Sequence, residues 1–260
     1  MTTLLFAVML LAGSPASWLR DAAAAEKEQA AKRAPYVYRE RQLNWHLDAK
    51  GRKEEPAVTR VYEHVFLEGA PYKQLIERNG KPLSGAELTK REAARKKEAA
   101  VRREDRRLRK PFLPGSRNVR LGQLEELESA YTLKVSGEEL VGEHPCVVIE
   151  AEPNGVTDTV RRKELQSYRQ RLWIHRDLKI LVKRRAEVIG PDSEILRGST
   201  ILFRWTPLAG EGGTWFAERG EIDFGATLFR VKTERGLQIH EYFDYRRFQV
   251  ESTITSDEPK

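Results

Sequence analysis

Apolar and polar side chains alternate along much of this chain, most clearly in residues 171–205. Leu172–Ile174 is a short apolar run that ends at a polar break. The next run places four apolar side chains on one side, interrupted by Arg184: Ile180, Val182, Ala186 and Val188. A third run places three large apolar side chains on one side of its strand: Ile201, Phe203 and Trp205. Alternation of this kind is typical of half-buried strands, so we predict an antiparallel three-stranded meander.

The same alternation recurs on both sides of the meander. We expect further strands over residues 36–47, 59–67, 72–77, 131–140, 144–152, 214–224, 227–232 and 239–251. Asn79 and Gly80 favour a type I′ turn, because both central residues of that turn need positive φ. We therefore predict about nine to eleven strands in one curved antiparallel sheet, a mainly β fold of the α+β class.

Residues 84–110 depart from this pattern and predict a long helix. Ser84 and Glu87 match a capping box, and residues 88–110 contain neither Gly nor Pro. The segment carries eleven Lys or Arg against five Asp or Glu, so +6 of the formal net charge of +7 lies here. Two interpretations stay open: a solvated helix with i,i+4 ion pairs, or a basic arm that contacts anionic lipid or an acidic partner. The second predicts six contact residues: Arg95, Lys96, Arg102, Arg103, Arg106 and Arg107.

The N-terminus has the pattern of an export signal. Leu4–Ala12 is an apolar run, too short to cross a bilayer, which needs about twenty residues. Small residues follow it, so we expect a signal peptide over residues 1–17, cleaved after Ala16 or Ser17. A buried N-terminal segment and an uncleaved anchor are the alternatives. We interpret residues 18–34 as a linker or frayed helix, and 35–255 as a single domain in the bacterial periplasm.

Catalytic and metal-binding motifs are missing from the sequence. It contains no G-x-S-x-G, H-E-x-x-H, C-x-x-C, Walker or G-x-G-x-x-G motif, and its five histidines are scattered. The single Cys146 is expected to be an inert core thiol. Glu150 and Glu152 share a strand face, but such pairs are common on charged strands. We expect no enzyme activity, no cofactor, no metal and, in an exported protein, no nucleic-acid partner.

Several segments together resemble one family of bacterial envelope proteins. They are VYEHVFLEGAPYKQLIERNGKPL, GEHPCVVIEAEP, QRLWIHRDLKILVKRR and EYFDYRRFQVEST. Over residues 36–254 the chain resembles the outer-membrane lipoprotein-sorting, LolA/LolB-like group, most specifically in LWIHRDLKILVKRR. The resemblance implies a strongly curved, unclosed antiparallel half-barrel with lid helices, whose concave apolar face holds acyl chains. The long basic helix departs from the lid helices of the small carriers.

The expected function is therefore a non-enzymatic periplasmic carrier or binding protein for lipid or the acyl chains of lipoproteins. Burying a methylene gains about 0.8 kcal/mol, so such a site needs only a dry apolar wall. The candidates for that wall are Trp173, Ile201, Phe203, Trp205, Leu228 and Phe243. Two alternatives remain: these side chains fill a solid core, or the chain is an envelope scaffold or peripheral module that acts through its basic helix.

Overall fold

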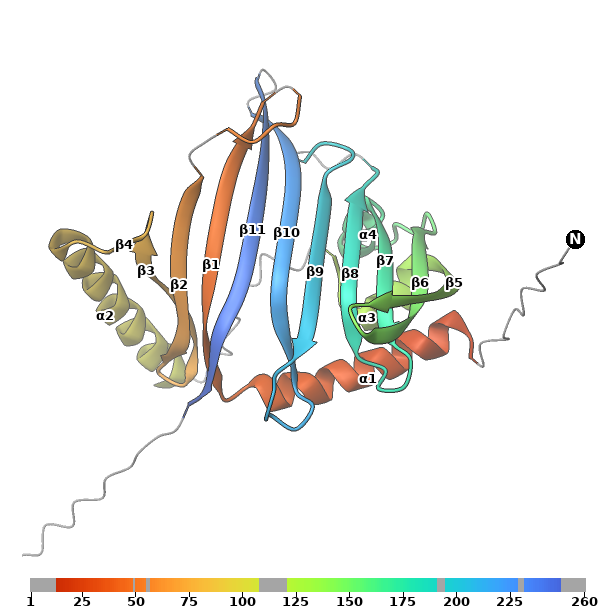
Figure 1. The fold of residues 1–260 in the computed structure, drawn as a ribbon, viewed down its shortest axis with the longest axis horizontal. Coiled ribbons are helices and arrows are strands. Elements are labelled where there is room, and N and C mark those ends of the chain that lie inside the picture. The colour runs from red at the N-terminus through yellow and green to blue at the C-terminus, as the bar shows by residue number, and fades with distance from the viewer. Residues whose placement is uncertain are drawn as a thin grey trace, which may run out of the picture.

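The computed structural model is one open antiparallel sheet with helices beside it (Figure 1). It describes residues 13–48, 50–54, 57–107, 121–190, 195–228 and 232–248, without the side chains of 105–107, 227–228 and 232–233. The described helices are α1 (Pro15–Arg33), α2 (Gly85–Arg107), α3 (Leu124–Ala130) and α4 (Val160–Leu165). The described strands are β1 (Tyr36–Leu47), β2 (Val58–Leu67), β3 (Ala70–Arg78), β4 (Lys81–Pro82), β5 (Tyr131–Val141), β6 (His144–Pro153), β7 (Tyr168–His175), β8 (Leu181–Val188), β9 (Thr200–Pro207), β10 (Trp215–Leu228) and β11 (Lys232–Arg247).

The strands form an eleven-stranded sheet in the order β4-β3-β2-β1-β11-β10-β9-β8-β7-β6-β5. Because its end strands β4 and β5 do not pair with each other, the sheet is not closed. The predicted curved, unclosed antiparallel sheet is confirmed, and the predicted meander is β7-β8-β9. The expected turn after β3 is also confirmed, since Asn79 and Gly80 have φ of 50° and 75°.

Two glycines that fall between the strand ranges expected from the sequence lie inside strands instead. Gly225 lies within β10 and Gly236 within β11. A Cβ on Gly225 would come within 2.8 Å of the Leu196 side chain, and one on Gly236 within 2.8 Å of the Phe224 ring. The absence of a Cβ at each glycine therefore allows the neighbouring side chain to pack directly against the glycine backbone, and the strands continue past both positions.

Residues 18–33 lie in a helix that packs one side into the core, which corrects the interpretation of this segment as a linker outside the fold. Ser14 caps α1 by accepting a hydrogen bond from the Ser17 amide, and Pro15 occupies the first helical position. Trp18 and Leu19 are 4% and 1% exposed and pack with α3 and strands β6 and β7. The apolar run Leu4–Ala12 lies outside the described residues.

The sheet has an inner face, against which α1 and α3 pack, and an outer face. The inner face contains Val147, Ile149, Leu172 and Ile174. Directly paired residues share a face, and one row of pairs runs across the sheet from β7 to β2: Leu172, Arg184, Phe203, Gly220, His240, Gln42 and Arg60. Residues far apart in the chain are thus placed on the same surface.

A register shift in the β7–β8 ladder changes the side of the sheet to which the first residues of β8 point. The pairing slips between Trp173 and Ile174. As a result, Leu181 pairs with Ile174 on the inner face, so Ile180 points the other way. Ile180 and Val182 pack with Trp173 and Trp215, while Ala186 and Val188 pack with Tyr168. The expectation that all four lie on one side was wrong, because the alternation of apolar and polar residues does not reveal a bulge, in which one extra residue reverses the faces that follow.

Helix α2 lies beside β3 at one edge of the sheet (Figure 1). The predicted capping box is present: Glu87 accepts from the Ser84 amide at 3.2 Å, and Ser84 Oγ accepts from the Glu87 amide at 3.5 Å. Among the α2 side chains that the structure describes, Ala99 alone is buried. The helix is therefore largely solvated, and residues 108–110 of the predicted helix lie outside the described part.

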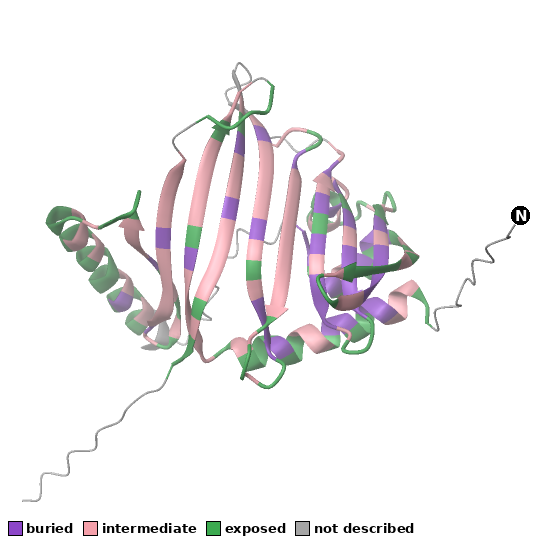
Figure 2. Ribbon diagram, viewed as in Figure 1, coloured by how far each residue is buried: buried purple, intermediate pink, exposed green. Residues whose placement is uncertain are grey.

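Burial is uneven along the sheet, as Figure 2 shows. Strands β6 to β8 are largely buried, whereas β9 and β1 are mostly of intermediate exposure. The helices thus cover one end of the inner face and leave the other less covered. Within the described ranges, no helix is long and apolar enough to span a membrane.

Candidate functional site

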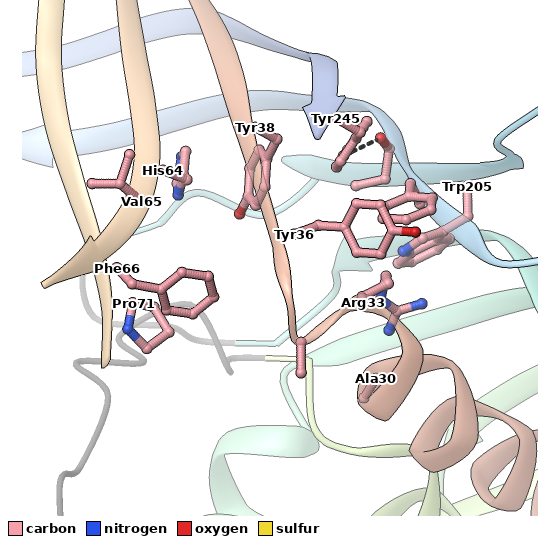
Figure 3. Close-up of a pocket in the computed structure, with 13 residues that line it drawn as sticks. Ala30, Arg33, Tyr36, Tyr38, His64, Val65, Phe66, Pro71, Trp205 and Tyr245 are labelled. Carbon is pink, nitrogen blue, oxygen red and sulfur yellow. Dashed lines mark hydrogen bonds between the residues drawn. The ribbon is translucent and has the colours of Figure 1, made fainter. Parts of the chain in front are cut away.

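A pocket of about 320 Å³ lies on the inner face, between the C-terminal end of α1 and the strands β1, β2, β3, β9, β10 and β11 (Figure 3). Its lining is mostly apolar or aromatic: Ala30, Arg33, Ala34, Tyr36, Tyr38, His64, Val65, Phe66, Pro71, Trp205, Phe216, Ala217 and Tyr245. This volume is near the lower end of the range for ligand pockets, about 300–1,000 Å³. The site is thus sized for a single chain or ring system.

Aromatic contacts fix the wall of the pocket. The ring of Phe216 lies 4.9 Å from that of Tyr36 and 4.4 Å from that of Tyr245. Tyr38 lies 5.1 Å from Tyr245 and stacks on His64 at 4.3 Å. Since such pairs hold one another in place, the wall is formed in advance of any ligand.

Two polar side chains tie the end of α1 to the start of β10. The Trp215 amide donates to Gln29 Oε1 at 2.7 Å, and Arg33 Nη1 donates to the Trp215 carbonyl at 2.9 Å. Arg33 also pairs with Glu26. These bonds hold α1 over the sheet and so define one side of the pocket.

An irregular backbone turns two tyrosines of β11 toward the same face. Tyr242 pairs with Glu40 on the inner face, so strict alternation would turn Tyr245 outward. Asp244 has φ of 56°, a left-handed conformation that aspartate adopts more readily than most residues. The β1–β11 register also shifts between Val37 and Arg39. Tyr245 consequently lines the pocket, where its hydroxyl donates to the Ala217 carbonyl at 2.6 Å.

A polar cluster adjoins the pocket at His64. Its centre is Glu40, which is 3% exposed. Oε2 of Glu40 lies 2.6 Å from His64 Nε2 and 2.8 Å from Lys73 Nζ, and Oε1 lies 2.7 Å from His240 Nδ1. The Lys73 ammonium also lies 4.1 Å from the centre of the Tyr62 ring. Four strands thus supply one carboxylate and three basic groups.

The cluster perturbs the ionisation of its neighbours. Burial opposes the charge on Glu40, but hydrogen bonds from His240, His64 and Lys73 outweigh it and hold the pKa of that carboxyl well below its ordinary value. Glu40 is therefore ionised at neutral pH. Burial, with the Glu40 charge as a second cause, raises the pKa of the Tyr38 phenol to about 12, so this phenol stays protonated.

The six predicted wall residues do not share one surface. Ile201, Phe203 and Trp205 lie on the inner face, and Trp205 lines the pocket. Phe203 covers Gly220, where a Cβ would come within 2.7 Å of the ring. Trp173 lies on the outer face, between Arg171 and Lys183 and bonded to Glu139 at 2.7 Å.

Phe243 also lies on the outer face, where it pairs with Arg39. Arg41 lies 5.2 Å from the centre of its ring. The side chain of Leu228 lies outside the described part. Of the wall candidates whose side chains the structure describes, the β9 residues therefore remain. The inner face is not apolar throughout, since Glu40, Gln42 and His240 occupy its centre.

Of the predicted basic contact residues, some are exposed and others are bonded to the protein itself. Arg95 and Lys96 are exposed, whereas Arg102 pairs with Glu98 and donates to the carbonyls of Leu67, Ala70 and Pro71. Arg103 lies 3.7 Å from Glu68. The side chains of Arg106 and Arg107 lie outside the described residues. Arg102 therefore ties α2 to the sheet instead of facing a partner.

The structure gives no support to the catalytic candidates from the sequence, Cys146 and the pair Glu150 and Glu152. Cys146 is fully buried, and burial raises the pKa of its thiol to about 11, as expected of an inert core thiol. Glu152 pairs with Arg169 at 2.6 Å on an open charged surface. In the ranges that the structure covers, no group of His, Cys, Asp and Glu side chains could hold a metal.

Sequence reasoning missed most of the pocket. Phe66 and Phe216 lie on strands that were predicted, but their place on one face depends on strand pairing. The aromatic alternation of Tyr36 and Tyr38 was the one available signal. No pattern marked Glu40, because an isolated glutamate in a polar strand normally faces solvent.

Several solved structures are similar to this chain, although no family model and no curated protein matches its sequence. A DUF1329 family protein from Desulfovibrio piger has 12% identity and a TM-score of 0.38, with 90% of this chain and 94% of that one covered. A LolA superfamily protein from Nitrosomonas europaea has 9% identity and a TM-score of 0.35, with the same coverage. The MucA/MucB complex of Pseudomonas aeruginosa has 12% identity and a TM-score of 0.27, with 91% and 100% covered.

A LolA superfamily protein is thus among the similar structures. Identities of 9–12% and TM-scores of 0.27–0.38 extend none of these proteins' functions to this chain.

Proposed function

We propose that this protein is a non-enzymatic binding protein or carrier for the acyl chain of a lipid or lipoprotein. The observation that supports the proposal is the aromatic pocket under the end of α1. Each methylene that leaves water for such a wall gains about 0.8 kcal/mol, so an acyl chain needs no directed hydrogen bond to bind. Trp205 is the wall residue that the sequence and the pocket have in common.

The place of action belongs to the same proposal. Residues 1–17 act as a signal peptide that delivers the chain to the bacterial periplasm, and one half-barrel domain follows. Cleavage after Ala16 or Ser17 removes Ser14 and Pro15 from the start of α1 and leaves Trp18 and Leu19, which pack in the core, next to the new N-terminus. Mass spectrometry of the protein recovered from the periplasm tests this through the mass of the mature chain.

Blocking the pocket tests acyl binding. Ala30 is exposed and lines the pocket from α1, so Ala30→Trp should fill part of it without disturbing the core. We expect an uncharged probe, dodecyl maltoside below its micelle-forming concentration, to change the tryptophan fluorescence of the native chain, because Trp205 lines the pocket. Its affinity should fall by about tenfold or more in Ala30→Trp, a loss of about 1.4 kcal/mol.

Ala31→Trp is the matched control, because Ala31 is exposed on the same helix but does not line the pocket. It should bind the probe as the native chain does. Acyl species found by native mass spectrometry after purification should be lost with the same selectivity. A native chain that neither copurifies with acyl species nor binds the probe would contradict the proposal.

The second candidate is a peripheral module that contacts anionic lipid through α2. The supporting observation is the exposure of Arg95 and Lys96 on a helix that buries little of itself. Each basic residue near an anionic surface contributes about 1 kcal/mol. Reversing both charges, Arg95→Glu with Lys96→Glu, should therefore weaken binding to phosphatidylglycerol vesicles by at least about tenfold in a flotation assay.

Lys134→Glu with Lys163→Glu is the control, because both residues are exposed outside α2. This reversal changes the net charge equally but should leave vesicle binding nearly unchanged. Equal losses in the two double variants would mean that only net charge matters and would remove α2 as a specific contact.

A further inference from the structure

The polar side chains that line the pocket are basic or neutral. They are the guanidinium of Arg33, the imidazole of His64, the indole of Trp205 and the phenols of Tyr36, Tyr38 and Tyr245. None of the lining residues, all of which the structure describes, carries a carboxylate. Glu26 and Glu40 pair with the basic groups but do not line the pocket themselves. The Tyr245 hydroxyl already donates to the Ala217 carbonyl, and the Tyr36 hydroxyl to Glu211. The pocket lining therefore presents no anionic group that would attract a cationic ligand.

His64 connects this pocket to a stronger basic group. Lys73 pairs directly with His64 across the β2–β3 ladder, so both side chains lie on the inner face. His64 Nε2 and Lys73 Nζ approach the same oxygen of Glu40, at 2.6 and 2.8 Å. The two strands are thus spaced to place an imidazole and an ammonium around one carboxylate oxygen.

The two basic groups remain accessible although Glu40 is not. The side chain of Lys73 is 40% exposed and that of His64 is 21% exposed, against 3% for Glu40. An ammonium has three donors, and the exposed part of Lys73 lets a second anion approach it beside Glu40. Charge-assisted hydrogen bonds of this kind are about twice as strong as neutral ones.

We propose that the pocket binds an amphiphile whose anionic headgroup, a carboxylate or a phosphate, contacts Lys73 and His64 while its acyl chain lies along Tyr38, Phe66 and Trp205. The inference rests on the proposed acyl-binding function and adds the class of ligand. It places the headgroup at the β2–β3 side of the pocket and the chain toward α1.

An isosteric pair of ligands tests the headgroup. Dodecanoate and dodecanamide have the same chain and nearly the same shape, but only the first is anionic at neutral pH. Each is titrated against the full chain carrying the fluorescent probe N-phenylnaphthylamine. We expect dodecanoate to bind about tenfold tighter than dodecanamide, and dodecylamine to bind no tighter than the amide. Dodecyl phosphate then distinguishes the two anions, because the preferred one identifies the natural headgroup.

Variants locate the contact. Lys73→Gln should bring the affinity ratio of dodecanoate to dodecanamide close to one while the amide keeps its affinity, and His64→Gln should lower the ratio in part. Lys81→Gln is the control, since Lys81 is exposed on the edge strand β4 and does not line the pocket. Circular dichroism checks that each variant is folded.

The outcomes separate the two proposals. A ratio near one in the native chain overturns the headgroup inference and leaves acyl binding intact, and this result needs no variant. A ratio that persists in folded Lys73→Gln and His64→Gln overturns the assigned contacts. If none of the dodecyl ligands displaces the probe, the acyl-binding function itself fails.

Discussion

Replacing Arg184 by methionine is expected to lower the free energy of unfolding by about 3 kcal/mol. Arg184 is buried on the inner face of β8, although it lies in a run of three consecutive basic residues. Burial lowers the pKa of its guanidinium to about 10, so the side chain is still charged at neutral pH. Methionine fills a similar volume but donates no hydrogen bond.

The expected loss comes from the acceptors that Arg184 satisfies. Nε donates to Gln170 Oε1 at 2.9 Å, Nη1 donates to the Gly122 carbonyl at 2.9 Å, and Nη2 donates to the Leu121 carbonyl. A buried acceptor left without a partner costs about 1–3 kcal/mol. Removing the buried charge offsets part of this cost, so the estimate is lower than the sum over three acceptors.

Urea unfolding measures the effect, with Arg185→Met as the control. Arg185 is the next residue in β8, and because side chains alternate along a strand it is exposed on the outer face. Its replacement should change the stability by no more than about 0.5 kcal/mol. Equal effects at the two positions would show that Arg184 does not hold the segment that precedes α3 to the sheet.

The strands could be predicted wherever local pattern and pairing agree. The meander of β7, β8 and β9 follows from alternation, and the start of α2 follows from Ser84 and Glu87, because both signals lie within a few residues of the structure they specify. Arg184 itself was predictable in part: of three consecutive basic residues on a strand, at least one must point to each face.

Helix α1 shows where composition misleads. Its alanines, lysines and glutamates have the composition of a solvated segment, and Trp18 and Leu19 are its only large apolar side chains. Its place in the core depends on its tertiary contacts. The small side chains of Ala22 and Ala23 let the helix approach the hydrophobic cluster closely, and Gln29 accepts a hydrogen bond from the backbone of β10. These partners are about 100 or more residues away in the chain, so no local window contains them.

The candidate site depends still more on register. Glu40, His64 and Lys73 meet because β1, β2 and β3 pair in one register, and His240 joins them from a strand 200 residues away. A slip of one residue would turn these side chains to the other face. The left-handed backbone of Asp244 turns Tyr245 into the pocket, although strict alternation along β11 would place Tyr245 on the outer face.

Glu40→Gln is the second substitution with a large expected effect. Glutamine cannot accept three charge-assisted hydrogen bonds, so His64, His240 and Lys73 lose their common partner. Breaking a buried ionic group in this way costs about 3–5 kcal/mol, and we expect a loss of about 3 kcal/mol at neutral pH. Glu218→Gln is the control, because Glu218 is exposed and pairs with Arg204 at 3.4 Å on the surface.

The pH dependence of this loss identifies its cause. The pKa of Glu40 is lowered from its ordinary value of 4.5 in the folded chain, so folding favours the ionised carboxylate. The stabilisation is therefore complete above the ordinary value and is lost as the pH falls through the folded pKa. Denaturant unfolding of the native chain and Glu40→Gln should give their largest difference in stability near neutral pH, with a difference that shrinks steadily below about pH 4.5. A difference that stays constant down to acid pH would mean that shape and packing, and not the charge on Glu40, hold the four strands together here.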